Sequence, residues 1–318
     1  MPPLPSFVQA LEHGIHVIDT GFYRPRFDAS YLMVEGGRGA FIDTATNHAV
    51  PRLLEALEAT GLTRDAVDFV IPTHVHLDHA GGAGLLMQHL PAARLVVHPR
   101  GARHLIDPAR LMAGARAVYG DAEVARSYGE VVGVPPERVL QTADGMTLEL
   151  AGRPLVFLDT PGHARHHHCI WDEASRGFFT GDTFGVSYRE FDTPRGPWLL
   201  PTTPPTQFEP DALRASIERL LSWKPDCMYV THYGRIAPPA ALASQLLDQL
   251  DAIVRLAEAL AAGPGRHAAL KDGLERIHLH SLRELGSSMP EARVHDLLEL
   301  DLELNAQGIG LWLDSRAA

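Results

Sequence analysis

The sequence predicts a protein of the α/β (α+β) class in which the ends of several strands meet at one edge of a sheet sandwich. Short apolar runs, which are typical of buried strands, alternate with longer segments in which apolar residues recur at helical spacing. Four of the apolar runs lead directly into histidine or aspartate, residue types that bind transition-metal ions. Together these observations predict a mixed fold that gathers metal-type side chains at one site.

Strands and a helix make up the first part of the expected fold. Early strands are expected at residues 16–20, 31–34, 40–44 and 94–98. A helix is expected over 51–60, because Pro51 stands in its first turn and Gly61 follows its end. The apolar run 69–71 predicts a further buried strand, which leads into the most informative motif of the chain.

Two regions are expected to be helical additions. Short helices are expected between about 99 and 138, where they could cover the mouth of the site, form a dimer contact or serve only as a surface elaboration. From residue 242 to 260, leucine, isoleucine and valine recur on one helical face. The sequence Gly263-Pro264-Gly265 ends that helix, and two more are expected after it.

The motif at residues 73–82 is the densest group of metal-type side chains. It holds four of them within six residues: His74, His76, Asp78 and His79. In extended backbone His74 and His76 point to the same side, because alternate residues of a strand share a face. Nitrogen and oxygen ligands at this density favour Zn, Fe or Mn over Ca or Mg.

Three further apolar runs supply more residues of the same kind, at His163, Asp182 and His232. With the four of the motif they make seven candidate ligands. Seven exceeds the four ligands of one tetrahedral zinc ion. The set instead suits two metal ions that share a bridging carboxylate and a bridging water.

The motifs THVHLDHAGG, TPGH, GD and TH resemble, in their order and spacing, those of the metallo-β-lactamase-fold metallohydrolase superfamily, in its glyoxalase II-like branch. The resemblance covers about residues 10–236. It implies a four-layer αββα sandwich, two mixed sheets back to back with helices outside. It also implies a catalytic domain over 1–238, with a helical insertion at 99–138, and a helical C-terminal extension over 239–318.

Carried over residue by residue, the resemblance implies two metal sites. The first would be formed by His74, His76 and His163. The second would be formed by Asp78, His79 and His232. Asp182 would bridge the two ions, and Asp78 and Asp182 are the expected catalytic carboxylates. No family ligand is missing, and the second site has no cysteine, unlike one group of true β-lactamases.

Further residues are candidates for contacts with the ligands or the substrate: Asp43, Asp159, His167, Tyr233 and His280. Asp43 and Asp159 end strands beside the site, where a carboxylate either accepts the free N–H of a ligand histidine or only caps the strand. His167 is expected to be structural or to support a ligand. Tyr233 is expected either to point at the substrate or to pack.

Two other segments have open roles. His280 lies in the C-terminal region with His278 and His295, where surface or packing roles are the simpler expectation. The segment 201–206, PTTPPT, is expected to be an extended loop that either lines the pocket wall or serves as an ordinary connection.

Composition limits the function classes. The net charge is −11 and no block of lysine or arginine stands out, which argues against nucleic-acid binding. No apolar run approaches the ~20 residues of a membrane span, and residues 1–6 do not resemble a signal peptide. Cys169 and Cys227 lie in apolar stretches and are expected to be buried thiols. We expect a cytoplasmic protein with a small-molecule substrate and no nucleic-acid or membrane partner, and a homodimer stays open.

The resemblance implies hydrolysis by a hydroxide that bridges two metal ions about 3.5 Å apart. Zinc is the expected metal, with iron or manganese as alternatives. One ion would stabilise the oxyanion and the other the leaving group. The expected substrate is a thioester, ester or lactone, since a thiolate leaving group needs little help from a proton donor. A lysine and arginine pattern for glutathione binding is not apparent.

Two alternatives from other classes stay open. Persulfide dioxygenases resemble the same family and use one Fe(II), for which the ligands here would be His74, His163 (or His76) and Asp182. The long helical tail counts against that assignment. The third hypothesis is a ligand-binding regulatory protein with weak thioesterase activity, against which the intact set of seven ligands argues.

Overall fold

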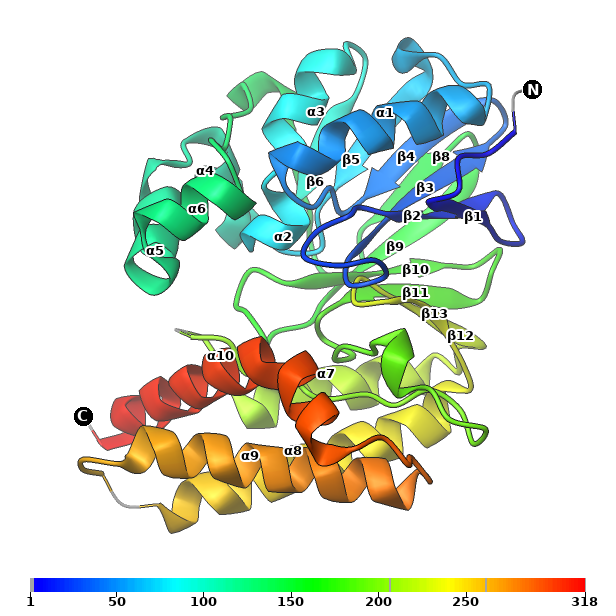
Figure 1. Cartoon of the computed structure of the whole chain (residues 1–318). Helices are drawn as coiled ribbons and strands as arrows, with labels where there is room; N and C mark the ends of the chain where they lie inside the picture. The colour runs from blue at the N-terminus through cyan, green and yellow to red at the C-terminus, as the bar shows by residue number, and fades with distance from the viewer. Residues whose placement is uncertain (1–2, 206, 261, 318) are drawn as a thin grey trace.

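The computed structural model describes residues 3–205, 207–260 and 262–317, and it shows two β-sheets packed face to face with helices outside both (Figure 1). The first sheet has the order β1-β2-β3-β4-β5-β6-β7, with strands Val8–Ala10, Ile15–Asp19, Ala29–Glu35, Arg38–Ile42, Val67–Ile71, Arg94–Val97 and Val139–Gln141. The second has the order β13-β12-β11-β10-β9-β8, with strands Gly234–Ile236, Cys227–Val230, Gly177–Gly181, His168–Asp172, Arg153–Asp159 and Thr147–Leu150. The predicted four-layer αββα sandwich is confirmed.

Strand alternation divides the apolar residues between the layers. In β3, Tyr31 and Met33 point into the core between the two sheets, whereas Leu32 points outward to the helices over the first sheet. This division follows from the two-residue period of a strand, which sends neighbouring side chains to opposite faces. The helices on that outer face are α1 (Val50–Ala59) and α3 (Ala83–His89).

The predicted elements of the first half are confirmed, with ends that differ by at most about two residues, as is usual for element boundaries. Pro51 stands in the first turn of α1, and Gly61 follows its end in a left-handed conformation with φ of 80°. A left-handed residue there favours glycine, because any other side chain would be strained. Short 3-10 helices occupy Asn47–Ala49, Arg64–Ala66, Pro136–Arg138 and Arg189–Phe191.

The insertion is helical, as predicted. Its helices are α4 (Pro99–Ile106), α5 (Ala109–Tyr119) and α6 (Asp121–Ser127). Met112, Val124 and Tyr128 of this region form a small apolar cluster with Leu77, the first residue of α2 (Leu77–Ala80). The insertion is therefore packed against the segment that carries the histidine motif.

The C-terminal helices cover the outer face of the second sheet (Figure 1). They are α8 (Pro239–Ala259), α9 (Arg266–Glu284) and α10 (Glu291–Ala317), and they join α7 (Pro210–Ser222) and the fully buried Trp198 in one apolar core. None of the helices in the described part of the chain is long and apolar enough to cross a membrane. Cys169 and Cys227 are buried free thiols, as expected.

One buried histidine links these helices to the rest of the fold. His278 of α9 donates from Nδ1 to Gln249 Oε1 at 2.9 Å, and Gln249 donates from Nε2 to the carbonyl of Leu199 at 2.6 Å. His278 Nε2 has no hydrogen-bond partner among the described residues, which fits a neutral ring. Burial lowers the pKa of His278 to about 4.

The pKa of His278 predicts acid lability of the C-terminal helices. The unfolded chain takes up this proton near pH 6.5 and the folded chain only near pH 4. The stability contributed by the neutral ring is therefore fully present above pH 6.5 and is lost as the pH falls toward 4, to the extent of about 3 kcal/mol. Chemical denaturation of His278→Gln between pH 7 and 4 should show a shallower loss of unfolding free energy than the parent.

His280→Gln, which removes an exposed histidine of the same helix, is the matched control and should follow the parent. Equal pH slopes for His278→Gln and the parent would contradict the assignment.

Candidate metal centre

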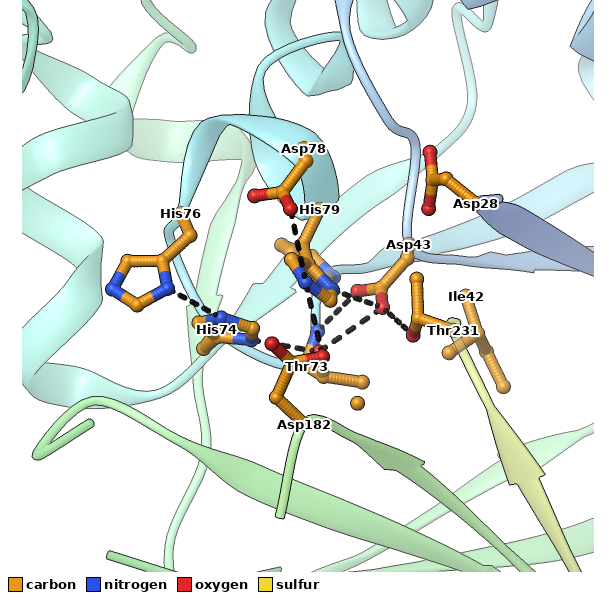
Figure 2. A network of polar contacts seen from close by, with 12 residues as sticks. Asp28, Ile42, Asp43, Thr73, His74, His76, Asp78, His79, Asp182 and Thr231 are labelled. Carbon is orange, nitrogen blue, oxygen red and sulfur yellow. Dashed lines mark hydrogen bonds and ion pairs between the residues drawn. The ribbon is translucent and has the colours of Figure 1, made fainter. Parts of the chain in front are cut away.

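Strand ends bring seven polar side chains to one edge of the sandwich. His74 and His76 follow β5, and α2 contributes Asp78 and His79. The second sheet supplies His163 from the β9–β10 connection, Asp182 directly after β11 and His232 after β12. Figure 2 shows His79 between Asp78 and Asp182, with His74 on one side of it and Asp43 on the other.

Three groups of these side chains have their ligand-type atoms within 4.8 Å of one another. They are His74, His76 and His163; His74, His79 and Asp182; and Asp78, His79 and His232. The first and third groups are the two triads that the family resemblance assigned to separate metal ions. Asp182 lies between them, because its Oδ1 is 3.4 Å from His79 Nε2 and its Oδ2 is 3.5 Å from His163 Nε2.

The packing of these atoms fits cations. His79 Nε2 and Asp182 Oδ1 are buried and have no hydrogen-bond partner among the described residues. The imidazoles also crowd together, with His76 Nδ1 only 2.9 Å from His74 Nε2 and 3.1 Å from His163 Nε2. Unpartnered buried polar atoms are rare in folded proteins because desolvation is costly. Imidazole nitrogens with carboxylate oxygens suit zinc, iron or manganese, so the residues fit the divalent ions that the arrangement implies.

The electrostatics of the centre hold some of its ligands, but not His79, in the protonation states that metals need. Burial and the neighbouring imidazoles hold the pKa of His74 well below its ordinary value. Burial acts to raise the pKa of Asp182, but His79 and two further histidines outweigh it and hold that pKa well below its ordinary value. For His79, burial acts to lower the pKa, but the surrounding carboxylates hold it well above the ordinary value. A metal ion must displace a proton from His79, so binding depends on pH.

Asp43 accepts the free N–H of His79, which is one of the two roles that the sequence left open for it. Its Oδ2 accepts from His79 Nδ1 at 2.8 Å and from Thr231 Oγ1 at 2.7 Å, and its Oδ1 accepts from the backbone N–H of Thr73 at 2.7 Å. With Nδ1–H engaged, His79 presents Nε2 to the centre. A carboxylate behind a ligand histidine fixes its tautomer and its orientation in this way.

Other imidazoles are also held from outside the centre. His163 Nδ1 lies 2.7 Å from Thr202 Oγ1, and His232 Nδ1 donates to the carbonyl of Phe27 at 2.8 Å. Neither partner was predicted from the sequence as a histidine contact. Thr202 belongs to the segment expected at the pocket wall, whereas a backbone carbonyl such as that of Phe27 leaves no signal because every residue type has one.

His167 supports the turn that carries Asp182. It is fully buried, with Nδ1 3.0 Å from Thr160 Oγ1 and Nε2 accepting from the backbone N–H of Asp182 at 3.3 Å. Gly181 must be glycine here, because it has a φ of 47° and an added Cβ would lie 2.7 Å from His167 Nε2. His167 thus positions the turn that carries Asp182, and a structural role of this kind was one of those expected for it.

For three candidate residues the structure decides between the roles that the sequence left open, and none of the three contacts the centre. Asp159 meets His98 Nε2 at 3.1 Å rather than a histidine of the centre, because it ends β9 with a half-exposed side chain. Tyr233 packs in the core between the sheets, and it is not one of the described residues that line the cavity beside the centre. His280 is 74% exposed and pairs with Glu284 of the same helix, because it points away from the core that buries His278.

A cavity of about 290 Å³ opens onto the centre. Its walls include apolar and aromatic side chains from three distant parts of the chain: Phe22, Leu111, Tyr119, Tyr128, Leu300 and Leu304. The insertion thus lines the cavity and is more than a surface elaboration, while its part in a dimer stays a prediction. Thr202, Pro204 and Pro205 of the expected loop also line it, and Thr206 lies outside the described residues. Arg110 is the one lysine or arginine among the described lining residues.

The position of Asp182 between the triads predicts how its loss acts. Asp182→Asn keeps the size of the side chain but removes the charge that faces both groups, so metal content should fall by at least one ion per chain with the fold retained. Elemental analysis together with circular dichroism measures both effects. Asp159→Asn removes a carboxylate outside the centre and should keep the parent's metal content. Full metal retention by Asp182→Asn would rule out the bridging arrangement.

Comparisons with known proteins place the chain among metalloenzymes. Residues 23–232 match the metallo-beta-lactamase superfamily. A hydroxyacylglutathione hydrolase of Acidiphilium cryptum is 29% identical over 269 residues, which cover 78% of this chain and 89% of that protein. An acyl-coenzyme A thioesterase of Bos taurus is 29% identical over 196 residues, or 55% of this chain and 64% of that protein, so the chain spans less than two thirds of this relative.

A solved structure agrees on the fold. A metallo-beta-lactamase family protein from Thermus thermophilus superposes with a TM-score of 0.68 at 23% identity, covering 97% of this chain and 96% of that one. The family match spans all seven side chains of the centre. The chain therefore belongs to the metallo-β-lactamase superfamily and is a metal-dependent hydrolase.

Proposed function

We propose that the protein is a binuclear hydrolase that cleaves a thioester with an apolar acyl group, and that esters or lactones of the same shape are alternative substrates. The observation that carries this proposal is the position of Asp182, whose two carboxylate oxygens face different triads at the floor of an apolar cavity. A single carboxylate so placed would be able to contact an ion in each triad.

The proposed ligands divide into two sets around Asp182. His74, His76 and His163 would hold one ion, and Asp78, His79 and His232 the other. Bound there, two divalent ions, zinc first with iron or manganese as alternatives, would lower the pKa of a water molecule and polarise the substrate carbonyl. Asp43 keeps Nε2 of His79 turned toward the centre, and Asp78 lines the cavity where the scissile group must enter.

The cavity supports an apolar acyl group. Aromatic and aliphatic side chains from the insertion and from α10 line the cavity beside the centre, as is usual for sites that bind apolar groups. Glutathione carries carboxylates, which would need cationic side chains in the cavity wall. Arg110 is the one lysine or arginine among the described lining residues, so the cavity favours a thioester of another thiol. A thiolate leaves without prior protonation because its pKa is about 8.5. The relatives named as an acyl-coenzyme A thioesterase and a hydroxyacylglutathione hydrolase support thioester chemistry at low identity.

A series of acyl thioesters of increasing chain length tests this function. Protein purified without added metal should contain about two ions of zinc, iron or manganese per chain, and a chelator should abolish hydrolysis. Each added methylene should raise kcat/KM roughly fourfold until the cavity is filled, because burying one methylene contributes about 0.8 kcal/mol. One iron per chain, oxygen uptake with a persulfide and no thioester hydrolysis would instead establish a dioxygenase.

Gly114 offers a test of where the acyl group lies. This glycine lies within α5 and lines the cavity, and an added Cβ would meet nothing within 4 Å. Gly114→Ala should therefore stabilise the protein by roughly 0.5–1 kcal/mol, since glycine weakens a helix interior. Gly114→Leu should narrow the cavity from this exposed position and raise KM for long acyl chains more than for short ones.

The neighbouring exposed position provides the control. Ala113→Leu adds a similar bulk to the same helix but does not border the cavity, so its kinetics should match the parent. If Gly114→Leu leaves the preference for chain length unchanged, the acyl group lies elsewhere.

A further inference from the structure

One short segment connects the C-terminal helices with the metal centre. Residues 198–204 run between the two, and Leu200 forms an isolated bridge with Val186, just after Asp182. Trp198 and Leu200 are fully buried. The segment has no regular secondary structure beyond this bridge, so its conformation depends on what it contacts.

The first part of the segment is held by α8 and α9. The backbone N–H of Leu199 donates to Gln245 Oε1 at 2.6 Å, and its carbonyl accepts from Gln249 Nε2 at 2.6 Å. Trp198 donates from its indole nitrogen to Ser281 Oγ at 3.0 Å. Side chains of two helices thus take the place of a neighbouring strand for this stretch of backbone.

The second part is held by α10 through Asn305, which is 3% exposed. Asn305 Oδ1 accepts from the backbone N–H of Thr203 at 2.7 Å, and its backbone carbonyl accepts from Thr203 Oγ1 at 3.0 Å. Its side-chain amide also donates to the carbonyl of Pro201 at 3.4 Å. The residues on both sides of Thr202 are therefore fixed by one asparagine.

The close contact of α10 with this segment requires a glycine. A Cβ added at Gly308 would lie 1.9 Å from the carbonyl oxygen of Thr203 and 2.5 Å from that of Pro204. Both obstacles are backbone atoms, which cannot swing aside as a long side chain can. Gly308 is thus what allows the helix to lie directly on the segment and Asn305 to reach it.

Between these fixed points, Thr202 touches the centre itself. Its Oγ1 lies 2.7 Å from His163 Nδ1 and 3.5 Å from the carbonyl oxygen of Asp182. His163 faces His76 and Asp182 with Nε2, so Nδ1 carries the proton and donates to Thr202, which can donate onward to the carbonyl of Asp182. A displacement of Thr202 would release the orientation of His163.

We propose that Asn305 and Gly308 are positioning residues for the metal centre, which act from the C-terminal extension by holding Thr202 against His163. In this proposal α10 lines the cavity and also supports, through Thr202, the binding site of the ion held by His74, His76 and His163. The proposal rests on metal binding and not on the identity of the substrate. Removal of such an outer partner typically weakens metal affinity by roughly 10- to 100-fold.

The affinity for Zn²⁺ alone, measured by competition with a chromophoric chelator, tests the proposal without a substrate. Two Zn²⁺ ions should bind in two steps, and Gly308→Ala should raise the dissociation constant of one of these steps by roughly 10-fold or more. Gly310→Ala is the matched control on the same helix, because its added Cβ would meet only the end of Arg266 at 3.7 Å, and it should bind as the parent does. Equal affinities for the two variants would overturn the proposal, even if Gly308→Ala unfolds at a lower temperature.

Thr202 supplies the chemical test. Thr202→Val keeps the shape but removes the hydroxyl, so it should show the same loss of affinity, and Thr202→Ser should restore most of it. If Gly308 acts through Thr202, the double variant Gly308→Ala/Thr202→Val should lose no more affinity than Thr202→Val alone. Additive losses would show that α10 acts by another route and would overturn the proposed one.

A milder variant keeps the test informative if Gly308→Ala does not fold. Asn305→Asp retains the acceptor for Thr203 but places an oxygen against the carbonyl of Pro201, so it should weaken Zn²⁺ binding while circular dichroism shows the parent fold. Parent-like affinity for Asn305→Asp and for Thr202→Val together would overturn the proposal. Because metal binding is measured without turnover, a failed thioester screen would leave this result unaffected.

Discussion

The close packing of largely buried imidazoles and carboxylates at the edge of the sheets is the constraint on which the rest of the structure depends. Such groups are costly to bury, and each must find a partner or a cation. Asp182 stands where this demand is greatest, with one oxygen toward each triad. Asp43 meets part of the demand from behind, through hydrogen bonds from His79, Thr73 and Thr231. The buried atoms left without a partner among the described residues, His79 Nε2 and Asp182 Oδ1, mark the place where divalent ions fit.

The fold meets this constraint by placing the ligands on the ends of strands from both sheets. β5 in the first sheet and β11 and β12 in the second run in parallel with a neighbour and end at the same edge. Their buried flanks fix the backbone on either side of each ligand, so little freedom is left where the side chains converge. Most of the ligands therefore lie at the ends of regular elements, which hold side chains more precisely than loops do.

In the proposed function, substrate selectivity would depend on other parts of the chain. The insertion and the C-terminal extension supply much of the apolar wall of the cavity, and both lie outside the strands that carry the ligands. A change such as one at Gly114 can alter the space for substrate without touching a ligand. The segment 198–204 is the exception, since it borders the cavity and also contacts His163, and Asn305 of the extension holds its Thr203.

The sequence by itself indicated the strands and the seven metal-type side chains that follow them, because short-range patterns carry that information, whereas the four layers were expected from the resemblance to the family. An apolar run followed by His or Asp fixes both a strand and what stands at its end. The partners of those residues were decided by the tertiary structure. Asp43 and Asp159 end strands in the same way, yet only Asp43 meets a histidine of the centre, because contact depends on how distant strands pack.

The same reason separates His278 from His280, which lie two positions apart on one helix, the first buried and the second exposed. Helical spacing indicates a face, but only the packed neighbours decide which face is buried. Thr202 and His163 are 39 positions apart in the chain, and Asn305 of α10 is 102 positions from Thr203, which it holds. No local pattern encodes such contacts, since they arise only when the chain has folded.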